Sequence, residues 1–245
     1  MLDSVMASIS LFDEVEVSVA DKISVIFENV SIDPVRNTAY KTAKLVKDTY
    51  GVSLCVRIKK GLPIGGGVGG SSADSAAVLY AAEKLCGADI KKLAPRVGSD
   101  VYFMTKGGTA RVSGTGDEVT PFDNKATFSA LIVNCGDVST PLCYDAYDTL
   151  GGNGAPSSEE LIKELSLGNL PENLLKNDLL PGALSLNARI GEAMELLRSK
   201  GVKSALTGSG GCIFAINAEK LAPFMQSNGF ECYTAHYVPR GVEEV

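Results

Sequence analysis

The stretch Gly65-Gly66-Gly67-Val68-Gly69-Gly70-Ser71-Ser72 has five glycines within six positions and runs directly into an alanine-rich segment, residues 73–82. Apolar residues in that segment recur at a spacing near 3.6, which predicts a helix. Glycine lets the backbone approach a ligand closely and turn its N–H groups toward it, while the positive end of a helix dipole favours a polyanion. The stretch therefore predicts a phosphate-binding loop.

A flexible linker is the alternative interpretation of a Gly-Ser stretch. It is disfavoured because this loop lies between Pro63 and a well-formed helix rather than between domains. Two other phosphate loops do not match. No Lys follows the glycines, as G-x-x-x-x-G-K-[ST] requires, and residues 59–63 separate the preceding strand from the first glycine, unlike a dinucleotide fingerprint.

Residues 63–74 resemble the ATP-phosphate loop of the galactokinase, homoserine, mevalonate and phosphomevalonate kinase (GHMP kinase) superfamily, P-x-x-x-G-L-G-S-S-A-A. The extra glycine and Asp74 are similar to one branch, the 4-diphosphocytidyl-2-C-methyl-D-erythritol kinases, which usually show G-L-G-G-G-S-S-D. Ser71 replaces the third Gly and Ala73 the second Ser, and both are small enough to keep a loop of backbone donors. The resemblance implies that ATP phosphates contact Pro63, Gly65, Gly66, Gly67, Val68, Gly69, Gly70, Ser71 and Ser72.

A second motif, residues 98–103, resembles the family's G-A-D-V-P-F. The resemblance implies that Asp100 is the base that takes the proton of the substrate hydroxyl, a role for which a carboxylate within hydrogen-bond reach is suited. An Asp after Gly-Ser and before an apolar run is also a common helix N-cap. The match continues through residues 107–112, and for that reason we favour the catalytic interpretation.

A third motif, residues 206–216, resembles the family's [MT]-[ST]-G-S-G-x-[CT]-x-F-A. The resemblance implies that Gly208, Ser209 and Gly210 lie beside the triphosphate and steady the first loop. A hairpin turn entering a strand is the structural alternative, with even odds from the residues alone.

In the family, a strand with a Lys and then a G-Y-H segment precede the part that this chain resembles. We therefore expect either that the chain starts late or that it is a divergent member.

The elements between the motifs follow ordinary patterns. Alternating apolar and polar residues predict a hairpin of two strands within residues 5–28 and a strand over 52–58. A cap at Asn37 or Thr38 and a stop at Gly51 predict a helix between them. Ser157 with Glu160 predicts a capping box, and residues 230–238 an edge strand. We predict an α+β protein with domains at 1–128 and 129–245. The resemblance implies the two-domain GHMP kinase fold, ribosomal protein S5 domain 2-like followed by ferredoxin-like.

Composition limits the possible functions. The chain has 245 residues, 45% of them hydrophobic, and a formal net charge of −6, which argues against nucleic-acid binding. It has no apolar run of about 20 residues and no signal-peptide pattern. The six cysteines form no C-x-x-C pair and the chain has one His, so we expect reduced thiols, no metal site made by these residues, and a cytoplasmic location.

The resemblance implies a kinase that uses ATP and Mg²⁺ to phosphorylate the 2-hydroxyl of 4-diphosphocytidyl-2-C-methyl-D-erythritol. We expect a small-molecule substrate, no nucleic-acid or membrane partner, and a monomer or homodimer. Two alternatives stay open: a truncated or divergent member that binds ATP without catalysis, and a GHMP kinase for another small alcohol.

Overall fold

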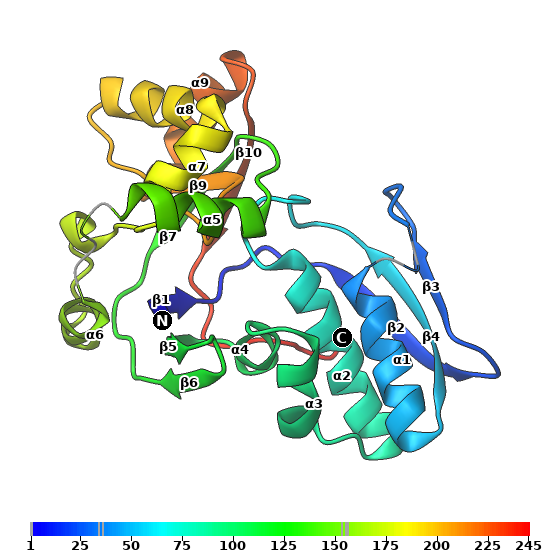
Figure 1. Ribbon diagram of the computed structural model, residues 1–245. Coiled ribbons are helices and arrows are strands. Elements are labelled where there is room, and N and C mark those ends of the chain that lie inside the picture. The colour runs from blue at the N-terminus through cyan, green and yellow to red at the C-terminus, as the bar shows by residue number, and fades with distance from the viewer. Residues whose placement is uncertain (1, 34, 36, 153, 155–156) are drawn as a thin grey trace. The chain divides into compact units, whose positions relative to one another are not determined.

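A computed structural model describes residues 2–33, 35, 37–152, 154 and 157–245, and the chain divides into two compact units (Figure 1). Unit 1 comprises Met1–Leu62, Gly69–Pro121 and Val238–Val245, and unit 2 comprises Pro63–Val68 and Phe122–Tyr237. The predicted domains 1–128 and 129–245 differ from these units, because part of the glycine loop packs in unit 2 and the chain end returns to unit 1. The division of the sequence into family domains at 1–128 and 129–245 stays a prediction.

Unit 1 contains two small sheets, with strand orders β1-β5-β6 and β2-β4-β3. The strands are β1 (Leu2–Ala7), β2 (Glu14–Ala20), β3 (Ser24–Phe27), β4 (Ser53–Lys59), β5 (Thr109–Gly114) and β6 (Glu118–Pro121). Strand β1 was not predicted, and it pairs antiparallel with β5 from Leu2 opposite Gly114 to Ala7 opposite Thr109.

The predicted hairpin within residues 5–28 is wrong. Both of its strands form, but β2 pairs antiparallel with β4 and β3 pairs parallel with β4, so β4 lies between them. The reason is the burial of β4, whose Leu54, Val56 and Ile58 are fully enclosed. A strand with that much buried surface takes the centre of a sheet, and the two alternating strands take its edges.

Helices cover one face of the β2-β4-β3 sheet in unit 1 (Figure 1). The helices on the sheet are α1 (Thr38–Tyr50) and α2 (Gly70–Cys86), and α3 (Ile90–Val97) and α4 (Val101–Lys106) pack against α2. Helix α1 begins and ends as predicted, with the Asn37 side chain accepting from the Tyr40 N–H and Gly51 in the left-handed conformation at φ 74°. The core between helices and sheet includes Val46, Leu54, Ile58, Leu79 and Leu93.

Unit 2 has one antiparallel sheet in the order β10-β7-β9-β8. Its strands are β7 (Ser129–Asn134), β8 (Ala205–Leu206), β9 (Cys212–Ile216) and β10 (Glu231–His236). Helices separate β7 from β8 and β9 from β10. This β-α-β-β-α-β connection with spatial order 4-1-3-2 is the ferredoxin-like arrangement. It confirms the predicted fold of the C-terminal half, and β10 is an edge strand as predicted.

The helices of unit 2 are α5 (Thr140–Leu150), α6 (Ser158–Leu167), α7 (Leu180–Leu186), α8 (Ala188–Ser199) and α9 (Ala222–Ser227), with short 3-10 turns η1 (Glu172–Leu174) and η2 (Glu219–Leu221). The core includes Leu131, Ile190, Leu197, Ile213 and Met225. Ser157 is the N-cap of α6, but among the described residues its side chain makes no capping bond, so the predicted capping box is wrong.

Within the residues that the structure describes, none of the helices combines the length and apolar character needed to cross a bilayer.

Candidate functional site

The first half of the predicted phosphate loop, Pro63–Val68, packs in unit 2 against the third glycine motif. Pro63 and Gly66 are buried and Val68 is half-buried, whereas Gly65 and Gly67 are exposed and have φ 68°. A Cβ on Gly67 would lie 2.5 Å from the carbonyl oxygen of Gly210 and 2.7 Å from that of Thr207. Only glycine fits this backbone approach, which explains one of the repeated glycines.

The third motif is the turn between β8 and β9, so the hairpin that sequence alone allowed is present. Gly208 has φ 48° and Gly210 φ 114°. A Cβ on Gly208 would lie 2.8 Å from the carbonyl oxygen of Gly67. Thr207 Oγ1 donates a hydrogen bond of 2.9 Å to the carbonyl oxygen of Gly66. The turn and the loop are therefore in direct backbone contact within unit 2.

Two further side chains hold this turn, and sequence reasoning gave neither of them a role there. Asn177 Nδ2 donates to the carbonyl oxygens of Leu206 and Gly208, at 3.1 and 2.7 Å. The hydroxyls of Thr140 and Ser209 are 2.7 Å apart, in hydrogen-bond contact. No short stretch of sequence marks Asn177 or Thr140 for this role, because they lie 29 and 69 positions from Leu206 and Ser209, the residues they contact.

Two side chains next to the first loop define its chemistry. A Cβ on Gly65 would collide with the Asp137 carboxylate, so an acidic group lies against the loop. A Cβ on Gly66 would lie 2.6 Å from the Cys212 sulfur. Burial raises the pKa of the Cys212 thiol to about 12, so this sulfur is a neutral packing group rather than a nucleophile.

The second half of the loop forms the N-terminus of α2 in unit 1. Gly69 is the N-cap with φ 78°, and its carbonyl oxygen accepts from the Ala73 N–H at 2.9 Å. Within the described residues no side chain caps this helix end, and residues 70–73 include no acid. The first N–H groups of a helix have no intrahelical partner. Gly69, Gly70, Ser71 and Ser72 therefore present backbone donors and the positive end of a 17-residue helix.

Side chains fix the first turn of α2 by holding the carbonyl oxygen of Ser71. Thr38 Oγ1 donates to it at 2.9 Å, and Ser75 Oγ at 3.0 Å. The hydroxyls of Ser71 and Ser72 make no hydrogen bond to any described residue, and Ser71 is exposed. The turn is therefore rigid in its backbone while both hydroxyls stay available for a ligand.

A buried charged cluster lies beneath this turn, formed by Lys60, Asp13 and Asp74, and we call it the Lys60 cluster. Lys60 Nζ lies 2.9 Å from Asp74 Oδ2 and also contacts Asp13 Oδ2. The three side chains are 6%, 2% and 6% exposed for Lys60, Asp13 and Asp74. Burial raises the pKa of the Asp74 carboxyl to about 7, because loss of hydration outweighs the attraction of Lys60.

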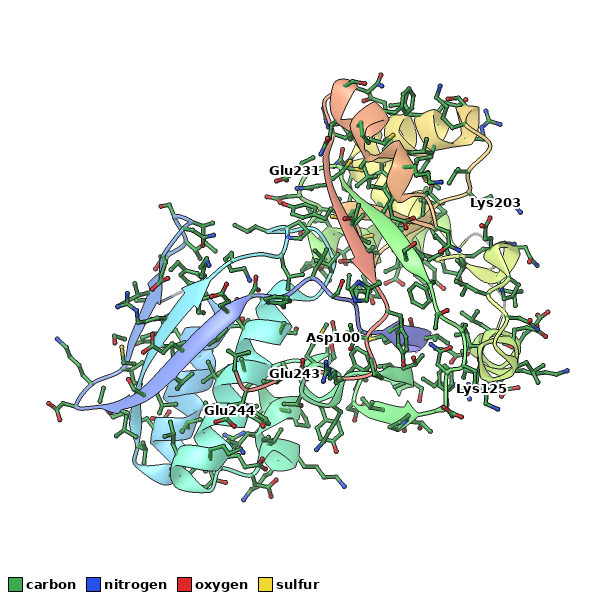
Figure 2. The ribbon with its side chains drawn as sticks, turned by 180° about the vertical axis from the view of Figure 1, so that it is seen from behind. Asp100, Lys125, Lys203, Glu231, Glu243 and Glu244 are labelled. Carbon is green, nitrogen blue, oxygen red and sulfur yellow. The ribbon has the colours of Figure 1, made fainter. Side chains whose placement is uncertain are left out.

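Asp100 is the N-cap residue of α4 and is half-buried in unit 1 (labelled in Figure 2). Its side chain makes no capping hydrogen bond to the described backbone. Ser99 Oγ instead donates to Asp100 Oδ1 at 3.1 Å. Asp100 thus lies at the N-cap position that the structural alternative predicted, but its carboxylate does not cap the described helix backbone.

Two family models match the chain: the GHMP kinases N terminal domain over residues 37–108, and the GHMP kinases C terminal domain over residues 158–229. A 4-diphosphocytidyl-2-C-methyl-D-erythritol kinase of Caldicellulosiruptor saccharolyticus is 31% identical, over 89% of this chain and 80% of that protein. One of Desulfitobacterium hafniense is 30% identical, over 98% of this chain and 88% of that protein.

Solved structures show the same likeness. A crystal structure of 4-(cytidine 5'-diphospho)-2C-methyl-D-erythritol kinase has a TM-score of 0.76 and 26% identity, covering 96% of this chain and 89% of the other. A mevalonate kinase from L. major has a TM-score of 0.64 at 17% identity, covering 98% of this chain and 90% of the other, and supports the fold alone.

Proposed function

Because this chain belongs to the GHMP kinase family, we propose that it transfers the γ-phosphoryl group of ATP to the 2-hydroxyl of 4-diphosphocytidyl-2-C-methyl-D-erythritol, in non-mevalonate isoprenoid precursor biosynthesis. The family and the fold predicted from sequence are confirmed, and the protein is an ATP-dependent small-molecule kinase. Relatives about 30% identical over most of their length bear the name of this kinase, which supports the choice of substrate.

The observation that carries the proposal is the packing of the two glycine motifs in unit 2. Gly67 and Gly208 approach so closely that a side chain on either would collide with backbone of the other motif. Such an arrangement is needless for a linker or an ordinary hairpin. It suits a loop whose backbone N–H groups must stay fixed around a polyanion.

In this proposal the residues have three roles. The backbone of Gly65–Ser72 holds the ATP phosphates, and the turn Gly208–Gly210 braces that loop. Asp100 accepts the proton of the attacking hydroxyl. Phosphoryl transfer needs mainly positioning and charge stabilisation, with an acceptor carboxylate adding a factor of ~10²–10⁴. A phosphate cradle and one carboxylate match those needs.

The residues present also suit Mg²⁺, which prefers oxygen ligands and usually takes one or two carboxylates together with substrate phosphates. In unit 1 the hydroxyls of Ser71 and Ser72 make no hydrogen bond to a described residue, and Ser71 is exposed. These are the groups that would hold the ion, which neutralises phosphate charge when bound. We further propose a cytoplasmic monomer or homodimer that acts on a small molecule, with no nucleic-acid or membrane partner.

The test is ADP release by the purified chain with Mg-ATP, measured with and without 4-diphosphocytidyl-2-C-methyl-D-erythritol and repeated with Asp100→Ala. We expect release that requires the cytidine substrate and falls about 10²–10⁴-fold in the variant.

Other outcomes select the alternatives. No release, while ATP still raises the melting temperature, would replace the proposal with a nucleotide-binding protein that lacks catalysis. Release with mevalonate or homoserine but not with the cytidine compound would identify a GHMP kinase for another alcohol.

A further inference from the structure

The Lys60 cluster connects the two sides of the glycine loop within unit 1. Asp13 Oδ1 accepts hydrogen bonds from the N–H groups of Gly61 and Leu62, at 2.7 and 2.9 Å, directly before the loop begins. Asp74 lies in the second turn of α2, after the loop ends. Lys60 Nζ contacts both carboxylates and therefore links the entry of the loop to its exit.

The position of Lys60 is fixed by its own backbone as well as by the carboxylates. Its N–H donates to Asn29 Oδ1 at 2.8 Å, and its carbonyl oxygen accepts from Asn29 Nδ2 at 2.7 Å. A Cβ on Gly70 would lie 3.4 Å from Lys60 Nζ. The ammonium group is therefore held beside the first residue of α2, where the free N–H groups begin.

Stability alone does not explain a cluster of this kind. Removing charged groups from water is so unfavourable that well-packed apolar side chains are often at least as stabilising as a buried ion pair. What ions add is a defined geometry, because each must meet its partner at hydrogen-bond distance. In the described part of the chain Asp74 Oδ1 has no partner, and a proton on that carboxyl would make the cluster neutral.

We propose that the Lys60 cluster is a positioning device for the ATP phosphates. Lys60, anchored by Asp13, fixes Asp74 and so sets the backbone donors of Gly70–Ser72 relative to the residues that enter the loop. The inference rests on the proposed function, since it assigns these donors to ATP. Lys60, Asp13 and Asp74 are positioning residues that touch neither substrate.

The test compares two variants of one residue. Asp74→Leu removes the link to α2 and leaves Lys60 paired with Asp13, so no charge is left unpaired. Asp74→Asn keeps an oxygen that accepts from Lys60. We expect Asp74→Leu to raise both the Kd for ATP, measured by calorimetry, and the KM for ATP by ~10- to 100-fold, as a misplacement of about 1 Å does. The KM for the acceptor stays within about twofold, and Asp74→Asn restores ATP binding to within about threefold.

The matched control is Lys59→Met. Lys59 is the neighbouring residue on β4, but it is 54% exposed and pairs on the surface with Glu14. The Lys59→Met variant should leave the Kd for ATP unchanged. If Asp74→Leu does not fold, Asp74→Ala, which removes the same link to Lys60 with a smaller side chain and leaves Lys60 paired with Asp13, takes its place with the same expectation.

Unchanged ATP affinity in a folded Asp74→Leu protein would overturn the inference while leaving the kinase proposal intact. A rise in both the KM for ATP and the KM for the acceptor, together with a lower melting temperature, would also overturn the inference, because that combination indicates general damage to the fold. If Asp74→Leu weakens ATP binding as expected but the wild-type chain releases no ADP, the inference would be supported and the proposed activity overturned. A wild-type chain that binds no ATP would overturn both.

Discussion

Thr207 Oγ1 donates a 2.9 Å hydrogen bond to the carbonyl oxygen of Gly66, a residue 141 positions earlier in the chain. The bond joins the turn between β8 and β9 to the first half of the glycine loop within unit 2. No local signal in the sequence requires it, because a Thr before Gly-Ser-Gly is equally suited to an ordinary hairpin. It shows that the two motifs act as one structural element.

Replacement of Thr207 by Val should therefore loosen the loop without changing the size of the side chain. We expect a loss of about 1 kcal/mol in the free energy of unfolding, typical of one hydroxyl donor, which Thr207 shares between the carbonyl oxygens of Gly66 and Cys212, and a higher KM for ATP. Thermal unfolding and steady-state kinetics measure both. Thr120→Val, at an exposed position of β6, is the control and should change neither quantity. Equal behaviour of the two variants would show that the Thr207 bond contributes nothing.

Gly67 and Gly201 form a second matched pair. Both have positive φ, 68° and 76°, so Ala at either position carries the cost of a left-handed conformation, about 1 kcal/mol. A Cβ on Gly67 also meets the carbonyl oxygens of Gly210 and Thr207, whereas no described atom lies within 4 Å of one on Gly201.

We expect Gly67→Ala to lower the free energy of unfolding by at least ~1 kcal/mol more than Gly201→Ala does, and to abolish ATP binding. Denaturant unfolding and calorimetry with ATP provide the two measurements. If both variants lose the same stability and both bind ATP, the close backbone approach has no energetic role.

Sequence periodicity predicted the elements well and their partners poorly. The helix that ends at Gly51 and the strand β4 formed where their caps and alternation indicated. The order β2-β4-β3 was not predicted, because alternation in β2 and β3 shows that each has one buried face but not which strand pairs with it. The ferredoxin-like half came from the family resemblance, and the strand order confirms it.

The same division applies to the site. The glycine loop and Asp100 could be selected because glycine repeats and Gly-Ser-Asp are visible in a short window. Asp13 and Lys60 could not, since they are 47 positions apart and either alone resembles a surface charge. Asn177 and Thr140 hold the third motif through contacts that only the folded chain brings together.

Asp89 and Asp100 are both N-cap residues and allow capping to be separated from catalysis. The Asp89 side chain accepts a hydrogen bond from the Lys92 N–H at 3.1 Å, whereas that of Asp100 makes no such bond to the described backbone. Asp89→Ala should lower the free energy of unfolding by about 1 kcal/mol with kcat unchanged. Asp100→Ala should lower kcat by ~10²–10⁴ with stability nearly unchanged. A stability loss in Asp100→Ala that matches Asp89→Ala would assign Asp100 to the helix instead.

The raised pKa of Asp74 makes stability depend on pH in a direction that can be checked. Its pKa is about 7 in the folded protein and 3.8 as the reference value, so the folded state holds the proton more tightly. This contribution to stability is fully present below pH ~4 and is lost as the pH rises toward 7. Asn in place of Asp74 resembles the protonated carboxyl and does not titrate.

The unfolding free energy of Asp74→Asn minus that of the wild-type chain should therefore increase with pH. The slope should approach about 1.4 kcal/mol per pH unit between pH 5 and 6 and decrease above that, and the difference should become constant above pH ~8. Denaturant unfolding at several pH values measures it. Thr120→Val, at an exposed position of β6, removes no titratable group, so it is the control and should show a difference that does not vary with pH. A constant difference for Asp74→Asn as well would mean that Asp74 is ionised throughout, with Lys60 outweighing the loss of hydration.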